Sequence, residues 1–185
     1  MLKKILLSVA AVIVLAVGII CVLASFQPSE YHTVRTGIIN APPQTVFPYV
    51  NNLHKWQEWS PWAKLDPNQK NSFEGPAEGT GAALKWAGDR NVGEGVMTIT
   101  DSKPNESIQM RLDFIKPFPG TNTVLFTLKP EGDRTSLTWD MSGRNNFFSK
   151  IMCVFMDMDK MVGGFFEQGF QNLNAKIAAQ GKTAA

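Results

Sequence analysis

An uninterrupted apolar run near the N-terminus is the strongest feature of the hydrophobic pattern. Residues 5–26 read ILLSVAAVIVLAVGIICVLASF and contain no charged side chain. A helix of roughly 20 residues, rising about 1.5 Å per residue, crosses the hydrocarbon layer of a bilayer. The pattern therefore predicts a membrane anchor over residues 1–26. Lys3 and Lys4 precede the run, which favours a cytoplasmic N-terminus with the rest of the chain outside the cytoplasm.

A cleaved signal peptide is the alternative interpretation of this segment. Val22-Leu23-Ala24 resembles a small-residue cleavage site, and cleavage would leave a secreted protein. The apolar part of a signal peptide usually runs only ~7–15 residues, which favours an uncleaved anchor here. Cys21 also suggests a lipid-modified N-terminus, but the β-branched Ile19 and Ile20 before it make a poor lipidation signal.

Mixed segments follow the anchor. Residues 27–32 (QPSEYH) predict a polar linker, and residues 33–40 (TVRTGIIN) are rich in β-branched side chains, which predicts a strand. Pro42 and Pro43 stop that strand and suit the first turn of a short helix. Residues 54–62 predict a further short helical turn or loop.

Alternation of apolar and polar residues then predicts several antiparallel strands. It is clearest over residues 107–114, where every second side chain is apolar, as in a half-buried strand. The strand candidates are residues 81–86, 92–100, 107–114, 123–128 and 136–141. Because Pro, Gly, Asn and Asp separate the later candidates, we expect consecutive hairpins and a meandering antiparallel sheet.

A long amphipathic helix is predicted over residues 147–180. Its apolar positions recur at steps of three and four residues: Ile151, Phe155, Met158, Val162, Phe165, Gly169, Leu173 and Ile177. Gly163-Gly164 predicts a kink or a break in the helix, because glycine is unfavourable in a helix interior. Residues 181–185 are expected to form a disordered tail. The order of elements predicts an α+β domain over residues 33–180, in which this helix covers the apolar face of a curved sheet.

Composition and charge exclude several classes of function. Without the anchor, the 185-residue chain has the length of one ordinary domain. Lys3 and Lys4 account for the net charge of +2, and no block of like charges follows, which argues against nucleic-acid binding. The two histidines and two cysteines lack metal-ligand spacing, so we expect no metal and no cofactor. Cys21 lies in the apolar run and Cys153 in the predicted terminal helix, so we expect no disulfide between them. No catalytic triad pattern is present, and we assign no catalytic residue.

Large apolar side chains are the candidates for ligand contact. Three of the five tryptophans cluster in the segment WQEWSPW, and the other two lie in predicted strands. Further large apolar side chains lie in the strands and on the terminal helix. The candidate contacts are Trp59, Trp62, Trp86, Phe114, Phe126, Trp139, Met158, Val162 and Phe165. The alternative is that they are ordinary core residues, which is the commoner role of such side chains.

A series of short motifs runs in a fixed order through about residues 33–178. The motifs are Ile39-Asn40-Ala41-Pro42, Val46-Phe47, Val50-Asn51, Trp56-Gln57-Glu58-Trp59-Ser60-Pro61-Trp62, Gly75-Pro76, Gly79, Gly81, Trp86, Val92-Gly93-Glu94-Gly95, Thr135, Trp139, Met141, Met156-Asp157-Met158-Asp159-Lys160, Gly163, Phe166, Glu167, Gly169 and Leu173. In these motifs the chain resembles the START-like, or SRPBCC, superfamily, and in particular its membrane-anchored polyketide cyclase/dehydrase-like members.

The resemblance implies the helix-grip fold, in which a curved antiparallel sheet holds a C-terminal helix with a hydrophobic cavity between them. We therefore expect membrane-tethered binding of a small hydrophobic ligand, such as a lipid or an isoprenoid-like molecule. A structural or interaction domain with a filled cavity remains an alternative, as does a polyketide cyclase/dehydrase-like enzyme, because a fold alone does not fix a function.

Overall fold

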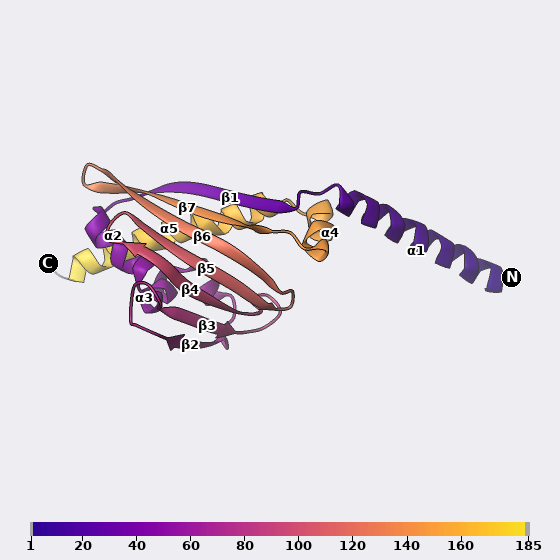
Figure 1. The fold of residues 1–185 in the computed structure, drawn as a ribbon, viewed down its shortest axis with the longest axis horizontal. Coiled ribbons are helices and arrows are strands. Elements are labelled where there is room, and N and C mark those ends of the chain that lie inside the picture. The colour runs from indigo at the N-terminus through magenta and orange to yellow at the C-terminus, as the bar shows by residue number, and fades with distance from the viewer. Residues whose placement is uncertain (1, 184–185) are drawn as a thin grey trace.

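The structure is a computed structural model that describes residues 2–183. One helix projects from a domain in which a curved sheet surrounds further helices (Figure 1). The elements are α1 (Leu2–Ser25), β1 (Glu30–Ile39), α2 (Pro43–Asn51), α3 (Leu53–Trp59), the 3-10 helix η1 (Pro61–Lys64), β2 (Lys70–Glu74), β3 (Ala83–Ala87), β4 (Glu94–Lys103), β5 (Ser107–Lys116), β6 (Gly120–Glu131), β7 (Arg134–Arg144), α4 (Phe147–Phe155) and α5 (Met158–Thr183).

The strands form one seven-stranded antiparallel sheet in the order β1-β7-β6-β5-β4-β3-β2. From β2 to β7 each strand pairs with the next along the chain, so this part is the predicted meander, while β1 pairs with β7 at the far edge. Register shifts between β4 and β5, at Glu94/Gly95 and Ile99/Asp101, help to bend the sheet. The predicted α+β fold with a curved sheet and a long C-terminal helix is confirmed.

One strand and one segment boundary at the edges of the sheet differ from the prediction. Strand β2 was missed because its five residues, KNSFE, contain Phe73 as their only large apolar side chain. The predicted linker over residues 27–32 is too long, because β1 already begins at Glu30, which pairs with Arg144 of β7. Backbone pairing across the sheet, rather than local polarity, sets this boundary.

The C-terminal helical segment is interrupted at a different place from the predicted one. The chain leaves helical geometry at Met156, and α5 then starts with the Asp157 carboxylate accepting a backbone N–H bond of 2.9 Å. Gly163 and Gly164 lie inside a continuous helix, so the break predicted there is wrong. Gly163 instead allows close approach of Arg35, because an added Cβ would overlap the guanidinium group.

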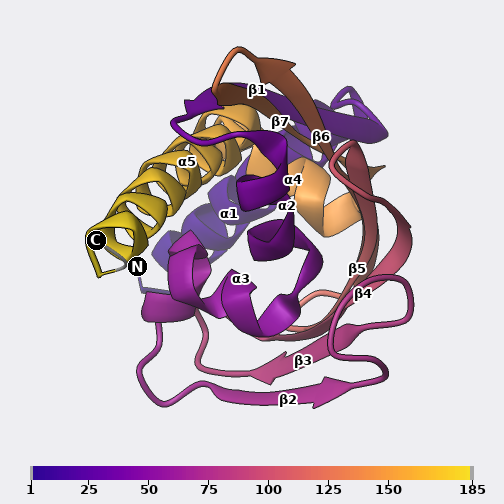
Figure 2. The same cartoon turned by 90° about the vertical axis from the view of Figure 1, so that its left-hand side faces the viewer.

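Helix α5 also runs past its predicted end. It extends to Thr183, so residues 181–183 are helical rather than part of a disordered tail. Residues 184–185 of that predicted tail lie outside the described residues. Inside the domain, α5 runs beside β1, and α2 and α3 occupy the neighbouring part of the concave side of the sheet (Figure 2).

Helix α1 stands apart from this core. Within residues 2–183 it is the one helix long and apolar enough to cross a membrane, with a mean hydropathy of 3.2 in its most apolar window. Its contact with the domain is confined to the last turns, where Ala24 is buried and α4 lies alongside. Both a membrane span and a signal sequence have these properties.

Candidate ligand-binding site

Aromatic side chains from four elements pack together at the centre of the concave side. Trp139 of β7 stacks on Phe166 of α5, with ring centroids 4.2 Å apart and planes inclined by 6°. The centroids of Phe126, Trp56 and Trp59 lie 4.7, 5.2 and 5.8 Å from that of Trp139. All five side chains are at most 5% exposed, so the protein's own rings occupy this part of the concave side.

Three of the predicted ligand contacts therefore belong to the packed core, namely Trp59, Phe126 and Trp139. The sequence also pointed to Phe165 as the inward residue of the terminal helix, whereas Phe166 is the fully buried one. Both phenylalanines fit the spacing of three to four residues from Val162. Helical periodicity alone consequently could not choose between them.

Two glycines allow large rings to lie directly against the backbone. An added Cβ on Gly169 of α5 would lie 2.9 Å from the Trp139 ring, which is closer than such atoms normally approach. An added Cβ on Gly95 of β4 would overlap the Trp86 ring and also meet the Asp113 carbonyl oxygen at 2.6 Å. Glycine is required at these positions because of close packing, not because of backbone conformation.

The two most deeply buried indoles differ in their hydrogen bonding. Trp59 Nε1 donates to the Tyr49 carbonyl oxygen at 2.9 Å. Trp139 Nε1 is buried and has no partner, and it is the only such side-chain atom among the residues that the structure describes. A buried donor without an acceptor typically costs about 1–3 kcal/mol. An unpaired donor of this kind is unusual enough to need an explanation.

A partly exposed apolar rim lies beside the core. The Trp62 ring of η1 and the Phe165 ring of α5 have centroids 5.3 Å apart, and Trp62 also meets Trp139 at 5.7 Å. Val162 and Met158 lie one and two turns before Phe165 on α5, respectively, and both are half-buried as well. We call Trp62, Met158, Val162 and Phe165 the η1–α5 rim. Four of the predicted ligand contacts thus lie together at the edge of the core.

The last two predicted contacts form a separate pair across the sheet. Trp86 of β3 and Phe114 of β5 are both partly buried, with ring centroids 5.9 Å apart in an edge-to-face arrangement. Trp86 Nε1 donates to the Val92 carbonyl oxygen at 3.0 Å, which fixes the indole over β4. Among the described side chains, no ring contact joins this pair to the central aromatic cluster.

An ion-pair network that the sequence did not reveal fixes the start of α5. The Arg35 guanidinium of β1 lies over Gly163 and contacts the Asp159 carboxylate at 2.9 Å and the Glu167 carboxylate at 3.3 Å. The hydrogen bond from Arg35 lowers the pKa of Asp159 below its ordinary value. Arg35 and Asp159 meet here although they lie more than 120 positions apart in the sequence. The network ties the rim-bearing half of α5 to the edge of the sheet.

Both histidines lie away from the aromatic core. His32, which was placed in the linker, belongs to β1 and contacts the Asp140 carboxylate at 2.9 Å. His54 stacks on Phe73, with ring centroids 3.6 Å apart. Over residues 2–183 no three His, Cys, Asp or Glu side chains are grouped so as to hold a metal ion.

Two surface hollows lie along the strands, and neither includes a predicted ligand contact. One, of about 510 Å³, is lined by residues of β1, β6 and β7, including His32 and Thr123. The other, of about 410 Å³, is lined by residues of β4, β5 and β6 and their connections, including Lys103 and Gln109. The predicted cavity between the sheet and α5 stays a prediction.

Residues 31–178 match the family described as polyketide cyclase / dehydrase and lipid transport, which covers nearly the whole domain. The chain belongs to this family. No curated protein matches the sequence.

Several solved structures share the fold of this chain. Protein CV1439 from Chromobacterium violaceum has a TM-score of 0.56 and 15% identity, covering 82% of this chain and 98% of its own. MLL2253 from Mesorhizobium loti has a TM-score of 0.56 and 20% identity, and the match covers 78% of this chain and 98% of MLL2253. Ara h 8.0201 has a TM-score of 0.55 and 10% identity, with coverages of 81% and 99%. At these identities the likeness is one of fold.

Proposed function

We propose that this family member binds a small hydrophobic ligand at the η1–α5 rim while α1 tethers it to a membrane. The proposal is supported chiefly by the buried, unpaired N–H of Trp139, whose ring centroid lies 5.7 Å from that of Trp62 in the rim. Trp62 covers Trp139 from a four-residue 3-10 helix, and a short element of this kind can shift at small cost. A ligand that takes the place of the Trp62 ring would find an apolar wall and one hydrogen-bond donor.

Replacement of the Trp62 ring by a ligand would cost little free energy. Burial of apolar surface contributes about 25 cal/mol per Å², so a ligand of similar area replaces the burial that Trp62 loses. An acceptor oxygen on the ligand would add a hydrogen bond to Trp139 Nε1 and relieve a buried unpaired donor. The ligand class is therefore an apolar body with one carbonyl or hydroxyl oxygen, as in a lipid or an isoprenoid alcohol.

The test uses the full-length protein in a mild detergent. Native mass spectrometry should reveal a co-purified lipid-sized molecule, and a fluorescent fatty-acid probe should bind saturably and quench tryptophan emission. Phe165→Ala should weaken probe binding about tenfold, since it removes roughly 1–2 kcal/mol of apolar contact. Phe73→Ala is the matched control, because Phe73 is also half-buried but contacts His54 rather than the rim. Equal loss in both variants would contradict the site.

One observation favours a second candidate function, a structural or interaction domain with a filled core. Trp59, Phe126 and Trp139 already pack ring to ring where the family resemblance led us to expect a cavity. This function predicts that the purified protein carries no small molecule and that the fatty-acid probe does not bind saturably. The same pair of measurements therefore separates the two candidates.

A further inference from the structure

Helix α4 (Phe147–Phe155) is apolar but contributes nothing to the core. Its sequence, FFSKIMCVF, contains Lys150 as its only charge, and none of its residues is fully buried. Phe147 is 55% and Phe155 64% exposed. Such a helix in an ordinary soluble domain would have its apolar face covered. The exposed phenylalanines of α4 indicate that something outside the domain covers them.

The loop between β5 and β6 extends this apolar surface. Phe118 of the loop stacks on Phe148 of α4, with ring centroids 3.6 Å apart and an interplanar angle of 22°. Phe118 is 45% and Ile115 50% exposed. Asn146 Nδ2 donates to the Pro119 carbonyl oxygen at 3.3 Å, which holds the loop and the start of α4 together. We call Ile115, Phe118, Phe147, Phe148 and Phe155 the α4 collar.

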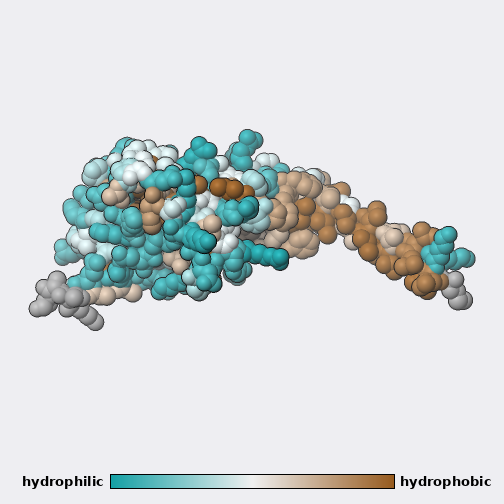
Figure 3. All heavy atoms as spheres, turned by 90° about the horizontal axis from the view of Figure 1, so that it is seen from below, coloured by the Kyte–Doolittle hydropathy of each residue, from teal (hydrophilic) through white to brown (hydrophobic). Residues whose placement is uncertain are grey.

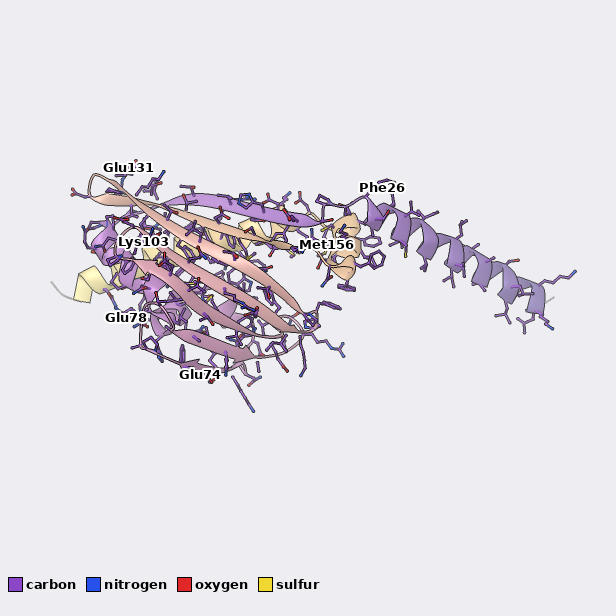
Figure 4. All side chains as sticks on the ribbon, in the orientation of Figure 1. Phe26, Glu74, Glu78, Lys103, Glu131 and Met156 are labelled. Atoms are coloured by element: carbon purple, nitrogen blue, oxygen red, sulfur yellow. The ribbon has the colours of Figure 1, made fainter. Side chains whose placement is uncertain are left out.

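The α4 collar lies at the end of the domain from which α1 leaves. Phe26 and Met156 mark that end, whereas Glu78, Lys103 and Glu131 lie toward the opposite end (Figure 4). The apolar surface of α1 continues onto the adjoining end of the domain (Figure 3). The segments 115–120 and 147–155 contain one lysine each and no Asp or Glu. Lys150 has no acidic partner among residues 2–183, whereas Lys116 pairs with Glu94 of β4. Apolar and basic residues without acidic ones suit the surface of a phospholipid bilayer.

The packing of α4 against α1 sets the depth of the collar. α1 has 24 residues and is therefore about 36 Å long, slightly more than the ~30 Å hydrocarbon layer. Its side chains are exposed except near its C-terminal end, at Ile20, Cys21 and Ala24, and α4 is the helix that contacts it. If α1 spans the bilayer, those last turns lie at the outer edge of the hydrocarbon. α4 must then lie at the level of the headgroups.

We infer that the α4 collar is a second lipid contact, which lies in the headgroup region of the bilayer that α1 crosses. The inference rests on the proposed membrane tether and goes beyond it, because a tether alone leaves the domain free to turn. Lys150 Nζ donates to Ser29 Oγ at 2.9 Å and joins α4 to the short segment between α1 and β1. Met158 begins α5 just after the collar, so docking holds the η1–α5 rim beside lipid.

The experiment measures depth by spin labelling of the full chain in phospholipid nanodiscs. The native cysteines are first replaced by Cys21→Ser and Cys153→Ser, and single cysteines are then introduced by Phe155→Cys, Leu15→Cys and Glu131→Cys. For each nitroxide, two collision rates are measured. One is the rate with oxygen, which concentrates in lipid, and the other is the rate with a water-soluble nickel chelate. Leu15 reports the tether, and Glu131 is the water-exposed control at the far end of the domain.

The ratio of oxygen to nickel collisions at residue 155 should be several-fold higher than at residue 131 and lower than at residue 15. A ratio at residue 155 equal to that at residue 131, with residue 15 in lipid, would overturn the collar and leave the tether intact. A water-exposed residue 15 would overturn both. Phe118→Cys repeats the measurement from the β5–β6 loop, so that the result does not depend on one labelled helix.

Discussion

The two buried indoles of the core provide a matched pair of substitutions. Trp59→Phe and Trp139→Phe remove the same atoms from side chains that are 1% and 2% exposed. Each leaves a small cavity, and we expect each to cost about 1–3 kcal/mol, a part of the ~3–5 kcal/mol lost when a whole aromatic side chain is truncated. The variants differ in one respect, since only Trp59 Nε1 has an acceptor, the Tyr49 carbonyl oxygen at 2.9 Å.

That difference sets the expected result. Trp59→Phe leaves the Tyr49 carbonyl without its donor, which adds about 1–3 kcal/mol, whereas Trp139→Phe removes a donor that had no partner. Trp59→Phe should therefore be the less stable variant by about 1–3 kcal/mol. At about 2–4 °C per kcal/mol for a domain of this size, the melting temperatures should differ measurably.

Thermal unfolding of the full-length protein in detergent, after removal of any co-purified lipid, measures this difference when followed by near-ultraviolet circular dichroism. Trp62→Phe is the control, because Trp62 is half-exposed and makes no hydrogen bond of this kind. If Trp139→Phe is as destabilising as Trp59→Phe, then Trp139 Nε1 has a partner in solution. The view of Trp139 as an unpaired donor would then be refuted.

The remaining predictions concern α5 and the tyrosines. Gly164→Ala should raise the free energy of unfolding by about 0.5–1 kcal/mol, because no atom lies within 4 Å of an added Cβ. Gly169→Ala should lower it by at least ~1 kcal/mol, because its Cβ would lie 2.9 Å from the Trp139 ring. Thermal unfolding of both variants tests these two expectations. Burial raises the pKa of Tyr31 to about 12 and raises that of Tyr49 from its usual 10.0. The folded state therefore favours the neutral phenols, and their burial stabilises the folded state fully below pH 10. This stabilisation is lost as the pH rises from 10 toward about 12, where Tyr31 ionises in the folded state. At pH 10 the folded protein should therefore show less tyrosinate absorbance than the unfolded chain, and equal absorbance in the two states would contradict the raised pKa values of Tyr31 and Tyr49.

Local patterns in the sequence were sufficient for most of the fold. The period of two in β5 and β7 and the spacing of three to four residues in α5 report which side of an element is apolar, and neighbouring residues alone determine that. The terminal charge-free run likewise identified α1 without any knowledge of the domain. The missed strand β2 and the helix break at Met156 show the limit, because neither has a strong local pattern.

The candidate site depended on contacts that no local pattern contains. Nothing in the sequence distinguishes Phe165, which lies at the rim, from Phe166, which lies in the core. No residue near Gly163 indicates that Arg35 lies across it. The residues involved are far apart in the chain and meet only when the sheet has curved around the helices.

Most elements, their apolar sides and the apolar N-terminal helix can be read from the chain alone, because each follows from side chains a few positions apart. Which aromatic rings fill the core, which remain at the rim, and that α4 lies exposed beside α1 become visible only in the folded domain. Curvature of the sheet and close packing fix the space available to each ring, and both depend on the whole domain at once.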